Sequence, residues 1–170
     1  MIRQIFWLAV ITLIPLLELR ASIPFGLFRM GETVPWPVVV SVCVVANILL
    51  GWLIFLVLGP VFQLFRRWYW FDRNVWPFLE RTRHRIQPYV EKYGELGVAV
   101  FIGIPLPGSG VYTGALGAYL LGVDRRKFIV ATVIGVFIAA VAVTALSLLI
   151  LHGVVGENSW AARLFLKKGI

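Results

Sequence analysis

The sequence has few charged residues, and three long stretches have none. Asp, Glu, Lys and Arg make up 14% of the 170 residues, whereas they make up about 25% of a typical soluble domain. The uncharged stretches are Trp36–Gln63, Leu96–Val123 and Phe128–Leu151. Each is longer than the roughly 20 apolar residues with which a helix crosses about 30 Å of hydrocarbon. A single soluble core could not bury three such segments, so we expect an all-α integral membrane protein.

Residues that bind metals or form disulfides are also scarce. The one cysteine, Cys43, lies within an apolar stretch and carries no information about disulfides. The two histidines, His84 and His152, are far apart and have no cysteine partner at ligand spacing. No Ser-His-Asp, Cys-His or paired-carboxylate arrangement is apparent. We therefore expect no metal site, no cofactor and no enzymatic activity.

Acidic residues are scarcer than basic ones, with 8 Asp and Glu against 16 Lys and Arg. Many of the basic residues crowd the segment 66–94, where tryptophan, tyrosine and phenylalanine alternate with them. Lys and Arg in short loops are retained on the cytoplasmic side of a membrane. We therefore predict that 66–94 is a basic, aromatic cytoplasmic loop with amphipathic helices, in a multi-pass protein of the inner cell membrane.

The mixture of arginine and aromatic residues in this loop is also compatible with a nucleic-acid site. Trp and Tyr beside Arg directly after a membrane span are, however, what a lipid–water interface selects. We favour the interface, and so expect membrane lipids and no nucleic acid among the partners. The segment 153–170 has a similar mixture, and we predict an interfacial tail there.

The chain divides into two similar halves, which we predict to be repeats within one membrane domain over 1–170. The first, 5–65, and the second, 95–152, each have an apolar run, a break and a long apolar span. We expect an inverted repeat in which each half is a broken helical hairpin followed by a transmembrane helix. The charge distribution leaves open whether each broken element crosses the membrane or turns back as a re-entrant hairpin.

The first break is expected at Glu18–Pro24, where two opposite charges interrupt an apolar segment. An ionisable residue at membrane depth is tolerated mainly where it is paired or faces a cavity. Because residues i and i+2 point to different sides of a helix, contact between Glu18 and Arg20 requires the backbone to unwind. Alternatively, both residues end a short anchor at the interface, and Asn47 provides only a packing hydrogen bond. The candidate residues for substrate or ion coupling are Glu18, Arg20, Ser22, Pro24 and Asn47.

The second break is expected at Pro105–Gly110, where prolines and glycines prevent a continuous helix. It belongs to a longer motif, Pro105–Gly114. Its hydroxyl groups can satisfy freed backbone groups or touch a ligand. The Gly110–Gly114 spacing can instead serve helix packing, and no Gly-Lys-Ser/Thr follows that would indicate a nucleotide site. The candidate residues of this second motif are Pro105, Pro107, Gly108, Ser109, Gly110, Tyr112, Thr113 and Gly114.

The two motifs, Glu18–Pro24 and Pro105–Gly114, together resemble those of the prokaryotic small multidrug export proteins, over nearly the whole chain. That family is similar, at a distance, to the DedA/VTT superfamily of lipid-handling membrane proteins. The resemblance implies re-entrant hairpins in an inverted repeat, with a substrate path between them. DedA-like proteins carry membrane-embedded charges in both halves, whereas no charged residue lies between Glu95 and Asp124 here. Only Glu18 and Arg20 are therefore matched to the family's charged residues.

We expect a transporter or lipid translocase, resembling a flippase or scramblase, that moves a lipid or a small amphipathic solute. Glu18 would bind a proton or cation, and Arg20 would contact an anionic group, in a protein that forms a homodimer. Two alternatives remain open. The protein could export lipophilic cations, or it could be a scaffold that transports nothing and recruits partners through the basic loop.

Overall fold

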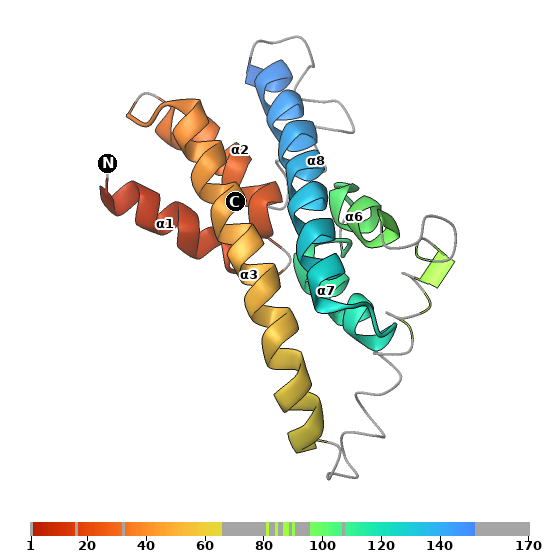
Figure 1. The fold of residues 1–170 in the computed structure, drawn as a ribbon. Helices are drawn as coiled ribbons and strands as arrows, with labels where there is room; N and C mark the ends of the chain where they lie inside the picture. The colour runs from red at the N-terminus through yellow and green to blue at the C-terminus, as the bar shows by residue number, and fades with distance from the viewer. Residues whose placement is uncertain are drawn as a thin grey trace. The chain divides into compact units, whose positions relative to one another are not determined.

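The computed structural model describes residues 2–15, 17–31, 33–65, 81, 84, 87–88, 90, 96–106 and 108–151. These residues form six α-helices, and no strand occurs among them. The helices are α1 (Ile2–Thr12), α2 (Glu18–Met30), α3 (Trp36–Phe65), α6 (Leu96–Gly103), α7 (Val111–Leu120) and α8 (Arg125–Leu151) (Figure 1). The all-helical prediction is confirmed for this part of the chain. Most of the predicted loop 66–94 and all of the predicted tail 153–170 lie outside the described residues.

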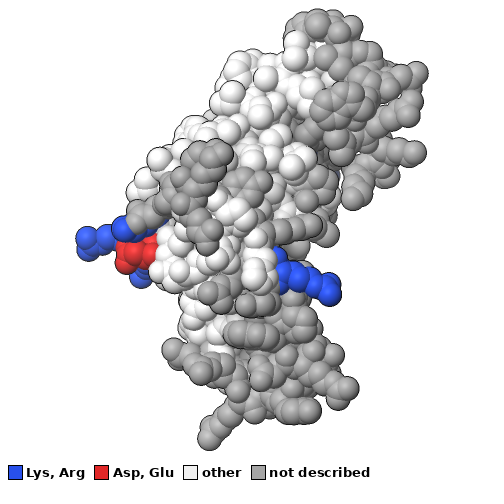
Figure 2. Space-filling model, turned by 90° about the vertical axis from the view of Figure 1, so that its right-hand side faces the viewer, with Lys and Arg blue, Asp and Glu red and all other residues white. Residues whose placement is uncertain are grey.

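Two of these helices, α3 and α8, are long and apolar enough to cross a membrane. They contain 30 and 27 residues, which is about 45 and 40 Å of helix. Large apolar side chains are exposed along both, among them Leu49 and Leu53 of α3 and Val130 and Val141 of α8. On the face drawn in Figure 2, charged groups show at only a few points of the described surface. An exposed apolar surface of this kind is solvated well by lipid and poorly by water.

The chain divides into two compact units, one made of Met1–Asn47 and Phe137–Ile170 and the other of Ile48–Val136. Both boundaries fall inside a long helix, so each unit takes one part of α3 and one part of α8. The first unit also contains α1 and α2, and the second contains α6 and α7. These units differ from the predicted repeats, which are consecutive segments of sequence; the repeats themselves stay a prediction.

In the first unit, α1 and α2 form an antiparallel hairpin. At its open end, the Gln4 side-chain amide donates a hydrogen bond of 2.9 Å to the Thr33 hydroxyl. At its closed end, the hydroxyls of Thr12 and Ser22 lie 2.8 Å apart. A side chain at Gly26 would collide with atoms of α1 and α3. The absence of a side chain at this position therefore lets the hairpin pack tightly.

The first break lies earlier in the chain than the sequence predicts. The sequence places it at Glu18–Pro24, but α2 begins at Glu18 and continues through Pro24, and the described non-helical residues before it are Leu13–Pro15 and Leu17. Pro15 lacks the N–H group that would extend α1, which explains where that helix ends. Pro24 is tolerated because one face of α2 is packed along its whole length. The buried apolar side chains of that face include Leu19, Ile23, Leu27 and Met30.

In the second unit, the break lies where the sequence predicts it. The short helices α6 and α7 are in contact, and the residues between them, Ile104–Gly110, are not helical where they are described. Gly108 has a φ of 82°, in the left-handed region that favours glycine. The Ser109 N–H donates to the Leu106 carbonyl at 3.2 Å and closes a turn around Gly108. The proline–glycine motif therefore produces a sharp turn between two short helices.

Close backbone approach and aromatic stacking hold the second unit together. A Cβ atom at Gly135 of α8 would lie 2.7 Å from the Ala99 carbonyl oxygen of α6. The rings of Phe55 and Phe128 stack with their centroids 4.3 Å apart, and so do those of Phe62 and Tyr119 at 5.2 Å. Within this unit, the missing side chain at Gly135 therefore lets α8 pack closely against α6. Aromatic stacking holds α3 against α7 and α8.

Candidate functional site

Polar side chains meet inside the first unit, although the surrounding helices are apolar. The Thr12 and Ser22 hydroxyls lie 2.8 Å apart, and the Ser22 hydroxyl donates to the Glu18 backbone carbonyl at 3.0 Å. The Cys43 thiol of α3 lies within hydrogen-bonding reach of both hydroxyls. Thr12, Ser22 and Cys43 are completely buried. The network therefore connects the end of α1, the first turn of α2 and the first part of α3.

Glu18 adjoins this network and is itself buried, with 5% of its surface exposed. Its carboxylate interacts electrostatically with the half-buried guanidinium of Arg20. The sequence predicts that such an interaction needs an unwound backbone, but both residues lie in the first turn of α2, and the non-helical residues end before Glu18. The pair is thus at the entry to α2, deep in the hairpin.

The backbone of Glu18 adopts an unusual conformation. Its φ is 46°, and it is the one non-glycine residue with positive φ in the described part of the chain. A residue with a side chain is destabilised in this left-handed region by about 1–3 kcal/mol. Strain of this kind concentrates at functional sites, where the surrounding structure holds the residue in place. The strain at Glu18 therefore marks it as a candidate for more than a packing role.

Asn47 is buried without a partner. It is 1% exposed, and neither its amide oxygen nor its amide nitrogen has a hydrogen-bond partner among the described residues. It follows Cys43 by one turn of α3 and so lies on the same helix face. The packing hydrogen bond considered from the sequence is thus not seen with any described residue. Because an unpaired buried amide costs about 1–3 kcal/mol, this position favours a polar partner such as a ligand group or a bound water. We refer to Thr12, Glu18, Ser22, Cys43 and Asn47 as the polar cluster.

The second motif has a structural role at several of its positions. The Ser109 hydroxyl lies 2.6 Å from the Ile104 carbonyl oxygen and 2.9 Å from that of Leu106, so it satisfies groups freed by the break. A Cβ atom at Gly114 would lie 2.6 Å from Ile102, which agrees with the packing alternative. Pro105, Tyr112 and Thr113 are half-buried, Gly110 is buried, and Pro107 lies outside the described residues.

The two predicted groups of residues belong to different units. Glu18, Arg20, Ser22, Pro24 and Asn47 are in the first, and the described residues of Pro105–Gly114 are in the second. The predicted substrate path between the two breaks therefore stays a prediction.

Sequence reasoning missed two members of the polar cluster, Thr12 and Cys43. Two further buried polar residues of the first unit, Thr144 and Ser147 of α8, were also missed. Threonine, serine and cysteine are common in apolar helices, so their types alone gave no signal. The one available clue was that several of them recur within the apolar segments of the same chain. No group of three His, Cys, Asp or Glu that could hold a metal occurs in the part of the chain that is described.

Comparison with known proteins gives one result. The family model described as "Putative small multi-drug export protein" matches residues 18–142 of the chain. The match begins at Glu18 and includes both motifs, so the resemblance drawn from them is confirmed. No curated protein and no solved structure matches the chain. The similarity to DedA/VTT proteins stays a prediction.

Proposed function

Because this chain belongs to the small multi-drug export protein family, whose name describes a transporter, we propose that it moves a lipid or a small amphipathic solute. In this proposal, proton uptake and release by Glu18 are coupled to the movement. The polar cluster is the proposed coupling site. The homodimer expected from the sequence is retained as part of this proposal.

The buried carboxylate of Glu18 is the observation that carries the proposal. In an apolar interior, a carboxyl group is tolerated either as the neutral acid or as an ion with a nearby positive charge. Glu18 has such a charge in Arg20. Protonation would weaken its interaction with Arg20, and deprotonation would restore it. A group that alternates between these two forms can couple proton movement to a change in what Arg20 binds.

The charges also indicate how substrates would be distinguished. An anionic head group would compete with Glu18 for the guanidinium of Arg20, whereas a lipophilic cation would bind the Glu18 carboxylate directly. The Asn47 amide offers one donor group and one acceptor, and neither is used by any described residue. We favour the anionic or zwitterionic amphiphile, because the cation alternative assigns no role to Arg20.

The test is transport by the purified protein in liposomes with an imposed pH gradient. Two probes are followed in parallel: a fluorescent anionic phospholipid, whose exposure to an external quencher reports its movement between leaflets, and a fluorescent lipophilic cation. We expect gradient-dependent movement of the lipid probe. Movement of the cation alone would support the exporter alternative, and movement of neither would support the scaffold.

The short helices support a re-entrant geometry for the two hairpins. α1, α2, α6 and α7 have 11, 13, 8 and 10 residues, or about 12–20 Å of helix each, and the hydrocarbon core is about 30 Å thick. In addition, α1 and α2 run antiparallel, with a hydrogen bond between Thr12 and Ser22 near the turn. A second hydrogen bond, between Gln4 and Thr33, holds the beginning of α1 beside the end of α2. We propose that each hairpin enters and leaves the membrane on one side, and that α3 and α8 cross it.

Labelling of single cysteines should show this topology. In a Cys43→Ser background, we expect Arg3→Cys and Arg29→Cys to react with a membrane-impermeant maleimide from outside the cell, and Lys127→Cys from the cytoplasm. All three positions are exposed, and serine keeps a hydroxyl for the network of the polar cluster. If Arg3→Cys and Arg29→Cys react from opposite sides, the first hairpin crosses the membrane and the re-entrant proposal is wrong.

Asn47→Leu should separate stability from transport. Leucine has a similar shape and leaves no polar group unpaired, so the variant should be as stable as the wild type or more stable by about 1 kcal/mol. If the amide serves the substrate or a water in the path, transport should nevertheless fall. Thermal unfolding in detergent and transport in liposomes are the two measurements. A stable variant that transports normally would remove Asn47 from the site.

A further inference from the structure

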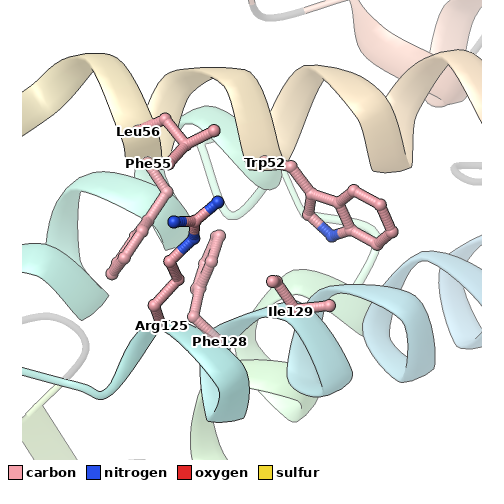
Figure 3. A pocket seen from close by; sticks show the side chains of 6 residues that line it. All are labelled: Trp52, Phe55, Leu56, Arg125, Phe128 and Ile129. Carbon is pink, nitrogen blue, oxygen red and sulfur yellow. The ribbon is translucent and has the colours of Figure 1, made fainter.

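A small cavity in the second unit combines a positive charge with aromatic walls. It has a volume of about 60 Å³ and lies between residues of α3 and the beginning of α8. Figure 3 shows the Arg125 guanidinium extending from α8 toward α3 among these side chains. The residues that line the cavity are Trp52, Phe55, Leu56, Arg125, Phe128 and Ile129. None of them is acidic, so the lining offers the guanidinium no carboxylate.

A second hydrogen-bond donor belongs to the same cavity. The indole N–H of Trp52 is buried and has no hydrogen-bond partner among the described residues. A tryptophan N–H and an arginine guanidinium are both donors only, and neither can accept a hydrogen bond. The lining of the cavity therefore contains two kinds of donor, one of them charged, among apolar side chains. Because the indole nitrogen is buried, a ligand reaches it only when the Trp52 side chain turns toward the cavity. This chemistry selects an anion that accepts several hydrogen bonds.

The size of the cavity suits the anionic group of a larger molecule. A water-sized group needs at least about 10–15 Å³ of such space, so about 60 Å³ holds the four oxygens of a phosphate. A complete drug-sized ligand needs roughly 300–1,000 Å³. Only the head of an amphiphile would fit, and the remainder of the molecule would lie outside the cavity.

The surface beside the cavity is suited to acyl chains. Leu56 lines the cavity and is itself exposed, and Leu53 and Val57, its neighbours on α3, are exposed as well. Leu56 follows Trp36, the first residue of α3, by twenty residues, or about 30 Å of helix. This is the thickness of the hydrocarbon core, so in a crossing α3 the cavity lies at the level of lipid head groups.

We propose that this cavity binds the phosphate of an anionic phospholipid, through Arg125 and the Trp52 N–H, with the acyl chains on the exposed apolar surface of α3 around Leu56. Phosphate and guanidinium form paired, charge-assisted hydrogen bonds. The bound lipid would fix the start of α8 at the membrane surface. The site is separate from the polar cluster and does not depend on the proposed transport function.

The test is lipid retention by the purified full-length protein in detergent, measured by native mass spectrometry during titration with phosphatidylglycerol. We expect Arg125→Gln to weaken retention about tenfold or more, since a charge-assisted hydrogen bond is lost. Trp52→Phe should weaken it by a smaller factor, because the ring remains and only the N–H is removed. The matched control is Arg126→Gln, which removes the same charge one residue later and does not line the cavity. It should retain the lipid as the wild type does.

Three outcomes would overturn the proposal. Equal losses in Arg125→Gln and Arg126→Gln would show diffuse attraction to a basic surface in place of a site. Equal retention of diacylglycerol, which has the same chains but no phosphate, would show that the apolar surface alone binds the lipid. Displacement of the lipid from the wild type by equimolar inorganic phosphate would assign the cavity to the free ion. Gel filtration of each variant confirms that it is folded, and Arg125→Lys, which keeps the charge, should retain part of the affinity.

Discussion

Replacing Glu18 with glutamine should abolish transport driven by a pH gradient, with the protein still folded. Glutamine has the shape of the neutral acid, so the buried surroundings of the side chain would accept it without a cavity or an overlap. It cannot release a proton, and Arg20 would lose the negative charge with which it interacts. Transport in liposomes should fall to the level of protein-free liposomes. Gradient-driven transport at the wild-type rate would exclude Glu18 as the coupling residue.

Two further variants make this result specific. Asp124→Asn removes an exposed carboxylate that accepts a hydrogen bond from the Arg126 N–H at the start of α8. Asparagine caps helices as well as aspartate does, so this control should transport normally. Glu18→Gly should relieve the left-handed strain at φ 46°, which is worth about 1–3 kcal/mol. A glycine variant that unfolds at a higher temperature and does not transport would show that glutamate is kept at this position for function.

The largest effect on stability is expected at Gly135. An added Cβ atom would lie 2.7 Å from the Ala99 carbonyl oxygen and 2.8 Å from Ile102 Cβ, and neither backbone can move away cheaply. Overpacking by one added group, as in Gly135→Ala, lowers the free energy of unfolding by about 1–3 kcal/mol. The larger side chain of Gly135→Leu should cost more than this and prevent the second unit from folding. Thermal unfolding of Gly135→Ala in detergent measures the destabilisation caused by the one added methyl group.

Gly59→Ala is the matched control for Gly135→Ala, since both glycines lie inside long helices. At Gly59 the new Cβ atom would lie 3.8 Å from the Tyr119 hydroxyl, an ordinary contact. Alanine is favoured over glycine inside a helix by about 1 kcal/mol, but its Cβ atom crowds the ring of Pro60, the next residue in α3. The two effects oppose each other, so Gly59→Ala should be close to neutral. If the two variants unfold at the same temperature, the close approach of α8 to α6 does not contribute to stability as proposed.

The two breaks show why local sequence signals predicted one turn well and placed the other wrongly. At Ile104–Gly110, prolines and glycines agree with one another, and Gly108 adopts the positive φ that glycine allows. Near Glu18 the signals conflict. Pro15 and Pro24 could each end a helix. The prediction placed the break at Glu18–Pro24 because the charges of Glu18 and Arg20 interrupt the apolar segment there. In the structure, α2 continues through Pro24 because its buried face packs against the unit around it.

Composition and the distribution of charge by themselves predicted that the chain is helical, that long apolar spans begin at Trp36 and at Phe128, and that Glu18 and Arg20 are exceptional. These properties depend on the hydrophobicity of each segment and on the hydrogen bonds of one helix, and both are local. Only the tertiary structure showed that Thr12, Ser22 and Cys43 meet, that Asn47 has no hydrogen-bond partner among the described residues and that Arg125 lines a cavity with Trp52. Residues so far apart in sequence are brought together by the packing of whole helices against one another, and no local pattern records which side chains will then be neighbours.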